Sequence, residues 1–145
     1  MKEKNRVGLG VFVCVFNKDL SKIMLIRRNT EKRKKWKADW GNVGGRIEFG
    51  ETSVDACIRE VREETGLKLK RSNLTLIHIK ETPYLLPYLH AVHFVYVTSI
   101  NENSKIVLNA ESESYKWFKI GALPQKTLDK KKDIITWWKE AKQKI

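Results

Sequence analysis

The chain has 145 residues, 41% of them hydrophobic and 32% charged, and its formal net charge is +12. This length and this apolar fraction predict one folded domain over residues 1–145 and exclude a disordered chain. No apolar run approaches the roughly 18 residues of a membrane span, so we expect a cytoplasmic protein without membrane contact.

The first predicted strand covers residues 7–16, an apolar run that follows the basic segment Met1–Arg6. A basic start before an apolar run superficially resembles a secretory signal. However, the run lacks a cleavage site of small residues, and Asn17-Lys18-Asp19 follows it directly. Its β-branched valines therefore favour a buried strand.

The next predicted strand covers residues 22–28, and the turn residues between the two strands indicate a hairpin. A strongly basic segment follows, since residues 27–37 carry seven Lys or Arg and one Glu, a net charge of +6. We expect a loop here. It is either a solvated surface excursion or a contact for the phosphates of a polyanionic ligand.

Residues 52–65 carry the signals of a helix that packs on the core. Thr52 is a good N-cap with Asp55 near the capping-box position, and Gly66 suits the left-handed residue that ends a helix. Core-facing side chains recur at spacings of four, three and four along one stripe. This stripe consists of Val54, Ile58, Val61 and Thr65.

Glu60, Glu63 and Glu64 lie at positions i, i+3 and i+4 and therefore share another face of the same helix. Three like charges on one face repel one another, and a hard divalent cation with oxygen ligands would compensate for this repulsion. The alternative is a solvated acidic surface, but such a helix usually carries Lys four residues from each Glu. The pattern therefore favours a metal site.

The second half of the chain predicts further strands and one more helix. Residues 99–105 are polar and are expected to form an exposed loop. The helix is predicted over residues 128–143, and residues 116–145 carry a net charge of +6. Its apolar stripe comprises Ile134, Ile135, Trp138, Ala141 and Ile145. The further strands are predicted at residues 74–81, 90–98 and 114–119.

The two cysteines, Cys14 and Cys57, fall in apolar segments, one in a predicted strand and one in the predicted helix. They lack the spacing of a metal site, so we expect two small core residues. Two buried cysteines of this kind suggest a reducing compartment.

Residues 45–67 match the signature of the Nudix hydrolases without a mismatch, so the chain resembles that superfamily and its MutT-like pyrophosphohydrolases. The matching residues are Gly45, Glu51, Arg59, Glu60, Val61, Glu63, Glu64, Gly66 and Leu67. The resemblance implies an α/β protein with the Nudix fold, an α/β/α sandwich that has a mixed β-sheet and a loop-helix-loop catalytic motif. The order of the predicted strands and helices is similar to that fold.

The resemblance also implies an activity. Nudix hydrolases cleave a diphosphate bond in compounds built of a nucleoside diphosphate linked to another group, and they use Mg²⁺ or Mn²⁺. The small size of this chain favours a nucleoside or deoxynucleoside triphosphate as substrate, with a nucleoside monophosphate as product.

Several site residues follow from the resemblance. Glu60 and Glu64 match the principal metal ligands, and Glu63 is a further ligand or the residue that activates water, so all three are catalytic candidates. The backbone of Gly44 and a distal acid, Glu111 or Glu113, are expected to complete the metal site. Arg59 matches an arginine that supports the motif by pairing with Glu51, and Gly45 and Gly66 are structural positions of the same motif.

The substrate contacts are predicted less directly. Relatives of the MutT type place a phosphate-binding arginine at the end of the second strand, where this chain has Arg27 and Arg28. Only one of the two can face the site if the strand alternates regularly, and we expect Arg27 to do so. Asn42 is a candidate to read a base edge, with a loop turn as the alternative. The aromatic candidates for stacking on a base are Trp36, Trp40, Tyr84, Tyr88 and Phe118, although a core position is an alternative for each.

One departure from the family concerns Val43, which stands where relatives often have Pro before the glycine pair. This departure does not change the expected catalysis, but it weakens any inference that this chain shares the substrate of one particular relative. The competing hypothesis is a nucleotide- or RNA-binding module, including one that processes RNA 5′ ends, which would use the basic surface. A homodimer and a partner bound by the basic C-terminal helix stay open.

Overall fold

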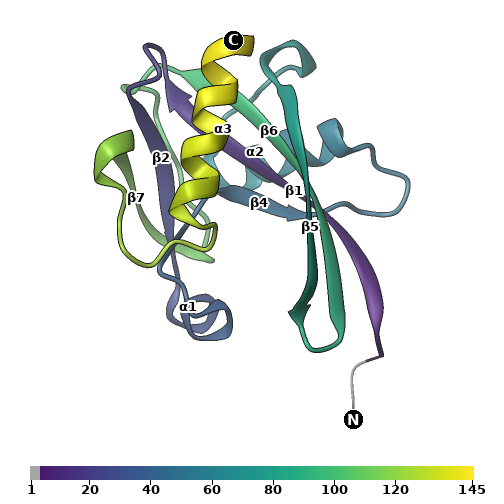
Figure 1. Cartoon of the computed structure of the whole chain (residues 1–145). Helices are drawn as coiled ribbons and strands as arrows, with labels where there is room; N and C mark the ends of the chain where they lie inside the picture. Colours follow the sequence, from purple (N-terminus) through teal and green to yellow (C-terminus); the bar gives the residue numbers. More distant parts are fainter. Residues whose placement is uncertain (1–3) are drawn as a thin grey trace.

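A computed structural model describes residues 4–145, which form a seven-stranded mixed sheet and three α-helices (Figure 1). The strands are β1 (Arg6–Asn17), β2 (Lys22–Arg28), β3 (Trp40–Gly41), β4 (Val43–Arg46), β5 (Thr75–Leu86), β6 (Leu89–Ile100) and β7 (Ser112–Lys119). The helices are α1 (Thr30–Trp36), α2 (Ser53–Thr65) and α3 (Lys131–Lys144), with short 3₁₀ turns at Arg71–Asn73 and Ile120–Ala122. The predicted domain also included residues 1–3, which lie outside the described residues.

The long strand β1 is the centre of the sheet. It pairs in parallel with β6 along its whole length, and β6 pairs antiparallel with β5. On its other side β1 pairs with β4 over Gly10–Val13 and with β2 over Val15 and Phe16. The strand β2 then carries both β3 and β7. Because β2 and β4 share the same side of β1, the sheet opens where these two strands separate.

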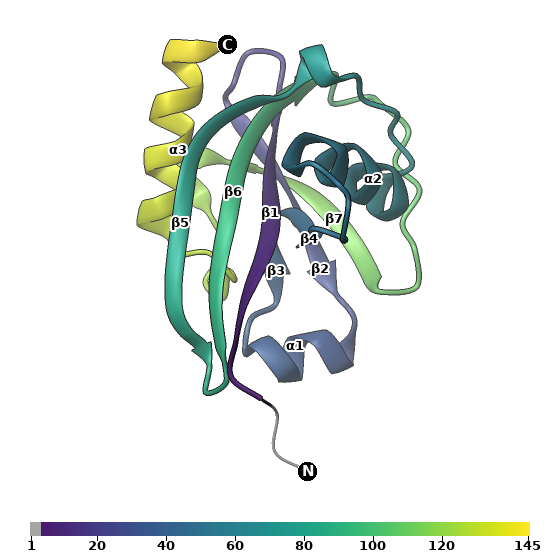
Figure 2. The ribbon, with the colours of Figure 1, turned by 90° about the vertical axis from the view of Figure 1, so that its right-hand side faces the viewer.

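Two helices cover the sheet, one on each face, as Figure 2 shows. The helix α2 packs Cys57 and Val61 against Val13 and Met24 of the sheet. The helix α3 packs Ile134 and Trp137 against the opposite face. The predicted α/β/α sandwich with a mixed sheet is therefore confirmed.

The local signals of α2 act as the sequence predicts. The Thr52 hydroxyl accepts a hydrogen bond from the Asp55 backbone N–H at 3.3 Å, which caps the start of the helix. Gly66 ends the helix in the left-handed conformation, with a φ of 77°. Val61 and Thr65 are buried, whereas Val54 and Ile58 are partly buried against the same core. The helix is thus held with one face fixed on the sheet.

Other elements differ from the prediction. The basic segment 27–37 contains α1, a short helix that the loop prediction missed because none of its residues is buried. The strand β5 continues through Thr82-Pro83 to Leu86, and β6 continues to Ile100, into the predicted loop 99–105.

The C-terminal helix begins at Lys131, not at residue 128, and its buried residues are Ile134, Trp137 and Ala141. Trp137 was not predicted to be in the apolar stripe, and Ile145 is 46% exposed, so its predicted place there is wrong. Trp138 is only partly buried, and its indole Nε1–H donates to the Leu20 carbonyl at 2.6 Å.

Both cysteines are free and buried, as predicted. Burial raises the pKa of Cys57 to about 12 and raises the pKa of Cys14 well above its usual value. Among the described residues, none of the helices combines the length and the apolar character needed to span a bilayer.

Candidate active site

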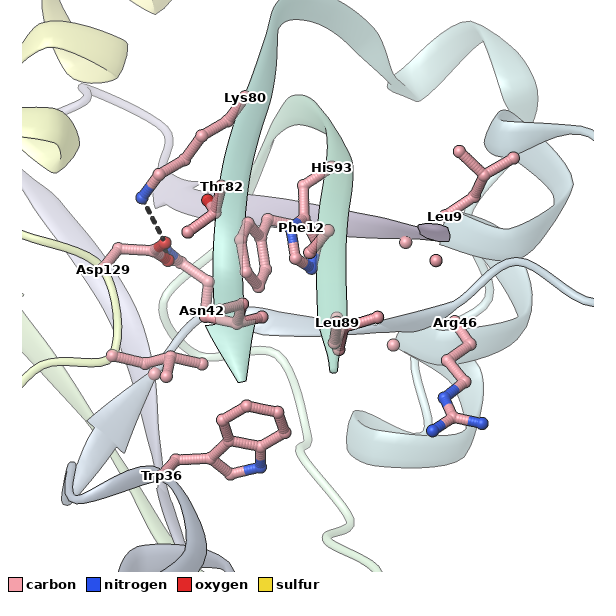
Figure 3. A pocket seen from close by; sticks show the side chains of 18 of the residues that line it. Leu9, Phe12, Trp36, Asn42, Arg46, Lys80, Thr82, Leu89, His93 and Asp129 are labelled. Carbon is pink, nitrogen blue, oxygen red and sulfur yellow. Dashed lines mark hydrogen bonds and ion pairs between the residues drawn. The ribbon is translucent and has the colours of Figure 1, made fainter. Parts of the chain in front are cut away.

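A cavity of about 1050 Å³ opens between the sheet, α1, α2 and the segment that leads into α3. Its two ends differ in composition. The acidic end, next to α2 and β4, contains Glu60, Glu64, Gly44 and Gly45. The opposite end, called the distal end below, contains Asn42, Asp129 and Lys80 (Figure 3).

Glu64 is the most deeply placed carboxylate of the acidic end, with a side chain that is only 2% exposed. It forms an ion pair with the Arg28 guanidinium, and its other oxygen accepts a hydrogen bond from the Gly44 backbone N–H at 3.0 Å. Burial nevertheless raises the pKa of Glu64 to about 7, because Arg28 offsets the loss of hydration only in part and Glu60 lies nearby. Additional positive charge would therefore stabilise the ionised form of Glu64.

Glu60 lies one helical turn before Glu64 and is 14% exposed. Its carboxylate lies so close to Gly45 that a Cβ atom at this position would come within 2.3 Å of Glu60 Oε1. Gly44 is equally confined, since its Cβ would come within 2.4 Å of the Val11 carbonyl oxygen. The glycine pair thus allows the acidic face of α2 to approach the backbone of β4 directly.

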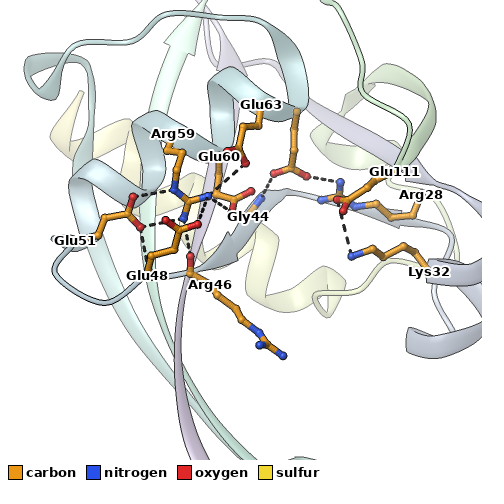
Figure 4. Close-up of polar contacts among 11 residues, drawn as sticks. Arg28, Lys32, Gly44, Arg46, Glu48, Glu51, Arg59, Glu60, Glu63 and Glu111 are labelled. Carbon is orange, nitrogen blue, oxygen red and sulfur yellow. Dashed lines mark hydrogen bonds and ion pairs between the residues drawn. The ribbon is translucent and has the colours of Figure 1, made fainter.

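Arg59 ties the loop before α2 to the helix (Figure 4). The predicted pairing with Glu51 is present, with Nε and Oε2 2.8 Å apart. The same guanidinium donates to the Arg46 carbonyl at 2.8 Å and to Glu60 at 2.8 Å. The hydrogen bond from Arg59 lowers the pKa of Glu51, which keeps that carboxylate ionised at neutral pH. Arg59 does not line the cavity, and its contacts are those of a supporting residue.

Glu63 is half exposed and lies outside the cavity lining, 3.3 Å from Arg59. Glu111 does line the cavity and lies 3.9 Å from Lys32, whereas Glu113 is paired with Arg27 and Arg33 and does not line it. Glu111 and Glu113 were the two candidates for the distal acid predicted to complete the metal site. The structure therefore brings only Glu111 to the cavity.

The acidic end suits a hard divalent cation. Glu60, Glu64 and the backbone of β4 offer only oxygen donors, which Mg²⁺ and similar ions prefer. Burial also raises the pKa of Glu60, so both carboxylates favour further positive charge. In this conformation, no three Asp, Glu, His or Cys side chains of residues 4–145 are arranged to hold an ion. Arg59 and Arg28 engage Glu60 and Glu64 instead.

The expectation that Arg27 faces the site is wrong. Arg28 lines the cavity, binds Glu64 and donates to the Asn42 carbonyl at 3.0 Å. Arg27 lies away from the cavity and pairs with Glu113 at 3.1 Å. The reason is the strand itself: Arg28 shares the face of β2 that Met24 and Ile26 turn toward the α2 side of the core.

Of the residues predicted to contact a base, some line the cavity and others lie outside it. Trp40, Asn42, Trp36 and Tyr88 line the cavity, whereas Tyr84 and Phe118 do not. Phe118 packs edge-on against Trp40, with ring centroids 5.0 Å apart. The structure therefore brings Trp40 and Asn42 to one cavity and leaves two of the aromatic candidates outside it.

The distal end contains residues that the sequence did not single out. Asp129 is 2% exposed, and Lys80 Nζ lies 3.6 Å from its Oδ1. Phe12 and His93 stack with their centroids 4.0 Å apart and their planes within 9°. Burial, with a smaller effect of Lys80, lowers the pKa of His93 to about 4, so this ring is neutral at physiological pH. These residues come from different strands and a loop, and no local pattern connects them.

Comparison with known proteins places this cavity in a family context. The model of the NUDIX domain matches residues 6–138. The chain is 29% identical over 126 residues to an ADP-ribose pyrophosphatase from Methanocaldococcus jannaschii, covering 85% of this chain and 70% of the relative. It is 30% identical over 77 residues to an m7GpppN-mRNA hydrolase from Xenopus laevis, covering 53% of this chain and only 26% of that relative.

A solved structure supports the same comparison at the level of the fold. The MutT NUDIX hydrolase from Burkholderia pseudomallei superposes with a TM-score of 0.70 at 26% identity, covering 85% of this chain and 91% of that one.

Proposed function

Because the chain belongs to the Nudix family of hydrolases, we propose that it cleaves the diphosphate bond of a nucleoside diphosphate derivative, with a nucleoside triphosphate as the favoured substrate. The observation that carries this proposal is the acidic end of the cavity. There a buried carboxylate, Glu64, and a partly buried one, Glu60, lie one helical turn apart and face a glycine pair beside an arginine. The products would be a nucleoside monophosphate and pyrophosphate.

Nudix hydrolases use divalent metal ions, and we propose Mg²⁺ or Mn²⁺ for this chain, held by Glu60 and Glu64 with Gly44, and with Glu63 and Glu111 as further candidates. A bound ion of this type neutralises phosphate charge and acidifies a coordinated water. The metal and catalytic assignments of these residues stay predictions. Their support is the oxygen-only donor set and the burial that favours added positive charge.

The side chains of the chain itself would do the rest. A carboxylate accepts the proton of the attacking water. Glu60 is the candidate for this base within the acidic end, and Glu63, which lies outside the cavity lining, stays a prediction. As the water oxygen bonds to one phosphorus, the bond from that phosphorus to the bridging oxygen breaks, and the leaving group, pyrophosphate or the nucleoside monophosphate, takes the electron pair. Arg28 and Lys32 line the same cavity and would bind the phosphates, while Arg59 and Glu51 keep the loop in place.

A binding module without catalysis is not favoured. Such a module needs basic and aromatic groups but gains nothing from two carboxylates at one end of its cavity. We also propose a cytoplasmic location, which the two free and buried cysteines support. One domain over the whole chain, and a homodimer as an open alternative, stay predictions.

Hydrolysis of a panel of nucleotides tests the proposed function. Release of pyrophosphate from triphosphates should require Mg²⁺ or Mn²⁺, stop on addition of EDTA and return when the ion is restored. Absence of turnover with every nucleoside diphosphate derivative in the presence of these ions would reject the proposal.

A further inference from the structure

The distal end of the cavity holds three polar side chains that meet from distant parts of the chain: Asn42 between β3 and β4, Lys80 of β5, and Asp129 before α3 (Figure 3). The Asn42 amide Nδ2 donates to Asp129 Oδ2 at 3.2 Å, and Lys80 Nζ lies 3.6 Å from Asp129 Oδ1. Asn42 is 1% exposed and Asp129 is 2% exposed, yet both line the cavity. The three side chains therefore form a row at its wall.

Asn42 has an unused acceptor. The NH₂ group of Asn42 donates to Asp129, so the Asn42 side-chain carbonyl faces elsewhere. That oxygen, Oδ1, is buried and has no hydrogen-bond partner. A buried acceptor without a partner is unfavourable by itself, and a ligand in the cavity that donates a hydrogen bond would satisfy it.

Along this row, Lys80 offers a hydrogen-bond donor, and Asp129 and then Asn42 each offer an acceptor. A ligand ring that complements this row presents three groups side by side on one edge: a hydrogen-bond acceptor, a ring N–H donor and an amino donor. Guanine presents this edge with O6, N1–H and its 2-amino group, and pterins present the same 2-amino-4-oxo arrangement. Adenine presents an amino donor next to an acceptor nitrogen and does not match.

We propose that the Asn42–Asp129–Lys80 row recognises the 2-amino-4-oxo edge of a guanine or pterin ring and selects against adenine. The inference deepens the proposed function, because the phosphates of such a nucleotide would extend toward the acidic end of the same cavity. The stacked Phe12–His93 pair and Trp36 also line the cavity and supply aromatic surface for the ring. His93 is neutral, so it adds no charge beside Lys80.

A purely structural role is the competing explanation. Lys80 also lies 3.3 Å from Asp133 in the first turn of α3, so the same lysine fastens that helix to β5. Asp133 does not line the cavity. Asp133→Asn therefore weakens the helix attachment without touching the recognition row, and it is the matched control for Asp129→Asn.

Binding of nucleoside monophosphates, followed by tryptophan fluorescence or calorimetry without added metal, tests the proposal separately from hydrolysis. GMP should bind about 10- to 100-fold more tightly than AMP, since a site built for a polar edge rejects a ring that lacks it. IMP, which lacks only the 2-amino group, should fall between them. Neopterin monophosphate distinguishes a pterin site from a guanine site by its affinity relative to GMP.

Asp129→Asn should remove most of the GMP preference, while Asp133→Asn should retain it. If Asp129→Asn does not fold, Lys80→Met provides the second variant, with the same loss expected. Equal affinity for GMP and AMP in the native protein, tighter binding of AMP, or equal effects of Asp129→Asn and Asp133→Asn would overturn the proposal. A chain that prefers GMP but hydrolyses no nucleoside diphosphate derivative would keep this inference and reject the proposed function.

Discussion

The two ends of the cavity are built in different ways. Except for Arg28, the acidic end comes from one stretch of chain, from Gly44 in β4 to Glu64 in α2. The distal end joins Asn42, Lys80 and Asp129, which meet only because the whole sheet is assembled. In the proposed function, the contiguous end carries the hydrolytic chemistry and the dispersed end selects the base of the substrate.

The ends also differ in how their charges are held. The carboxylates of the acidic end are paired with arginines that an ion could replace or supplement. At the distal end, Asp129 is fixed between an amide and an ammonium group in a nearly closed environment. If this contrast is correct, changes at the acidic end should lower turnover for all nucleotides, and changes at the distal end should alter the preference among them.

Glu64→Gln should give the largest effect, because it removes charge from the centre of the acidic end while preserving shape. We expect kcat to fall on the order of 10³-fold, by the same factor for GTP and ATP. Steady-state kinetics with both substrates measures this. Glu63→Gln is the matched control and should have a smaller effect, since Glu63 lies outside the cavity lining. Turnover at the native rate in Glu64→Gln would remove Glu64 from the site.

Gly45→Ala should lower activity by displacing Glu60 while leaving the stability of the fold nearly unchanged. The new Cβ would meet the Glu60 carboxylate, the end of a flexible side chain, so we expect Glu60 to move and kcat to fall on the order of 10²-fold with little change in Tm. Gly44→Ala would instead meet the Val11 backbone oxygen and should destabilise the fold by about 1–3 kcal/mol. Thermal unfolding of both variants tests this, and a large loss of Tm in Gly45→Ala would contradict the expectation that Glu60 moves aside.

Arg28→Met should raise KM for triphosphates roughly tenfold and lower stability by about 3 kcal/mol, because it leaves Glu64 buried without its cation. Adding Glu64→Gln to the same chain should restore most of the stability. Arg27→Met should change neither KM nor Tm noticeably, since Arg27 is an exposed partner of Glu113. A larger KM effect in Arg27→Met than in Arg28→Met would reverse the assignment of the two arginines.

Lys80→Met should have the smallest effect on turnover and the most selective one. We expect KM for GTP to rise roughly tenfold and KM for ATP to change little, with kcat for GTP largely retained. Kinetics at matched enzyme concentration measures both ratios. An equal rise in KM for the two nucleotides would show that the ends of the cavity do not act separately.

The sequence predicted α2, and the shared face of Glu60 and Glu64 on it, because these signals are local, whereas Glu63 lies outside the cavity lining. The N-cap Thr52, the apolar stripe and the final Gly66 lie within one short segment, and spacing alone places Glu60 and Glu64 on one face. The resemblance to a known signature added the pairing of Arg59 with Glu51, which is present in the structure.

What the sequence could not provide depends on strand register and on contacts between distant segments. Residues Ile23–Ile26 are buried on both faces of the sheet, so no alternation shows which of Arg27 and Arg28 turns toward α2. The short helix α1 has no buried residue and therefore no apolar period to detect. Asp129 and Lys80 had no local signal at all, since their partners lie dozens of residues away along the chain.

The two protonated, hidden thiols have a practical consequence. The pKa of Cys57 is about 12, and the pKa of Cys14 is raised well above its usual value. Because both thiols are also buried, neither sulfur should react with maleimides or iodoacetamide while the fold is intact. Lys35 of α1 is exposed and lines the cavity. A cysteine introduced there, as in Lys35→Cys, could then carry a fluorophore without prior removal of the native pair. A reporter at that position would follow nucleotide entry in real time on otherwise unaltered protein.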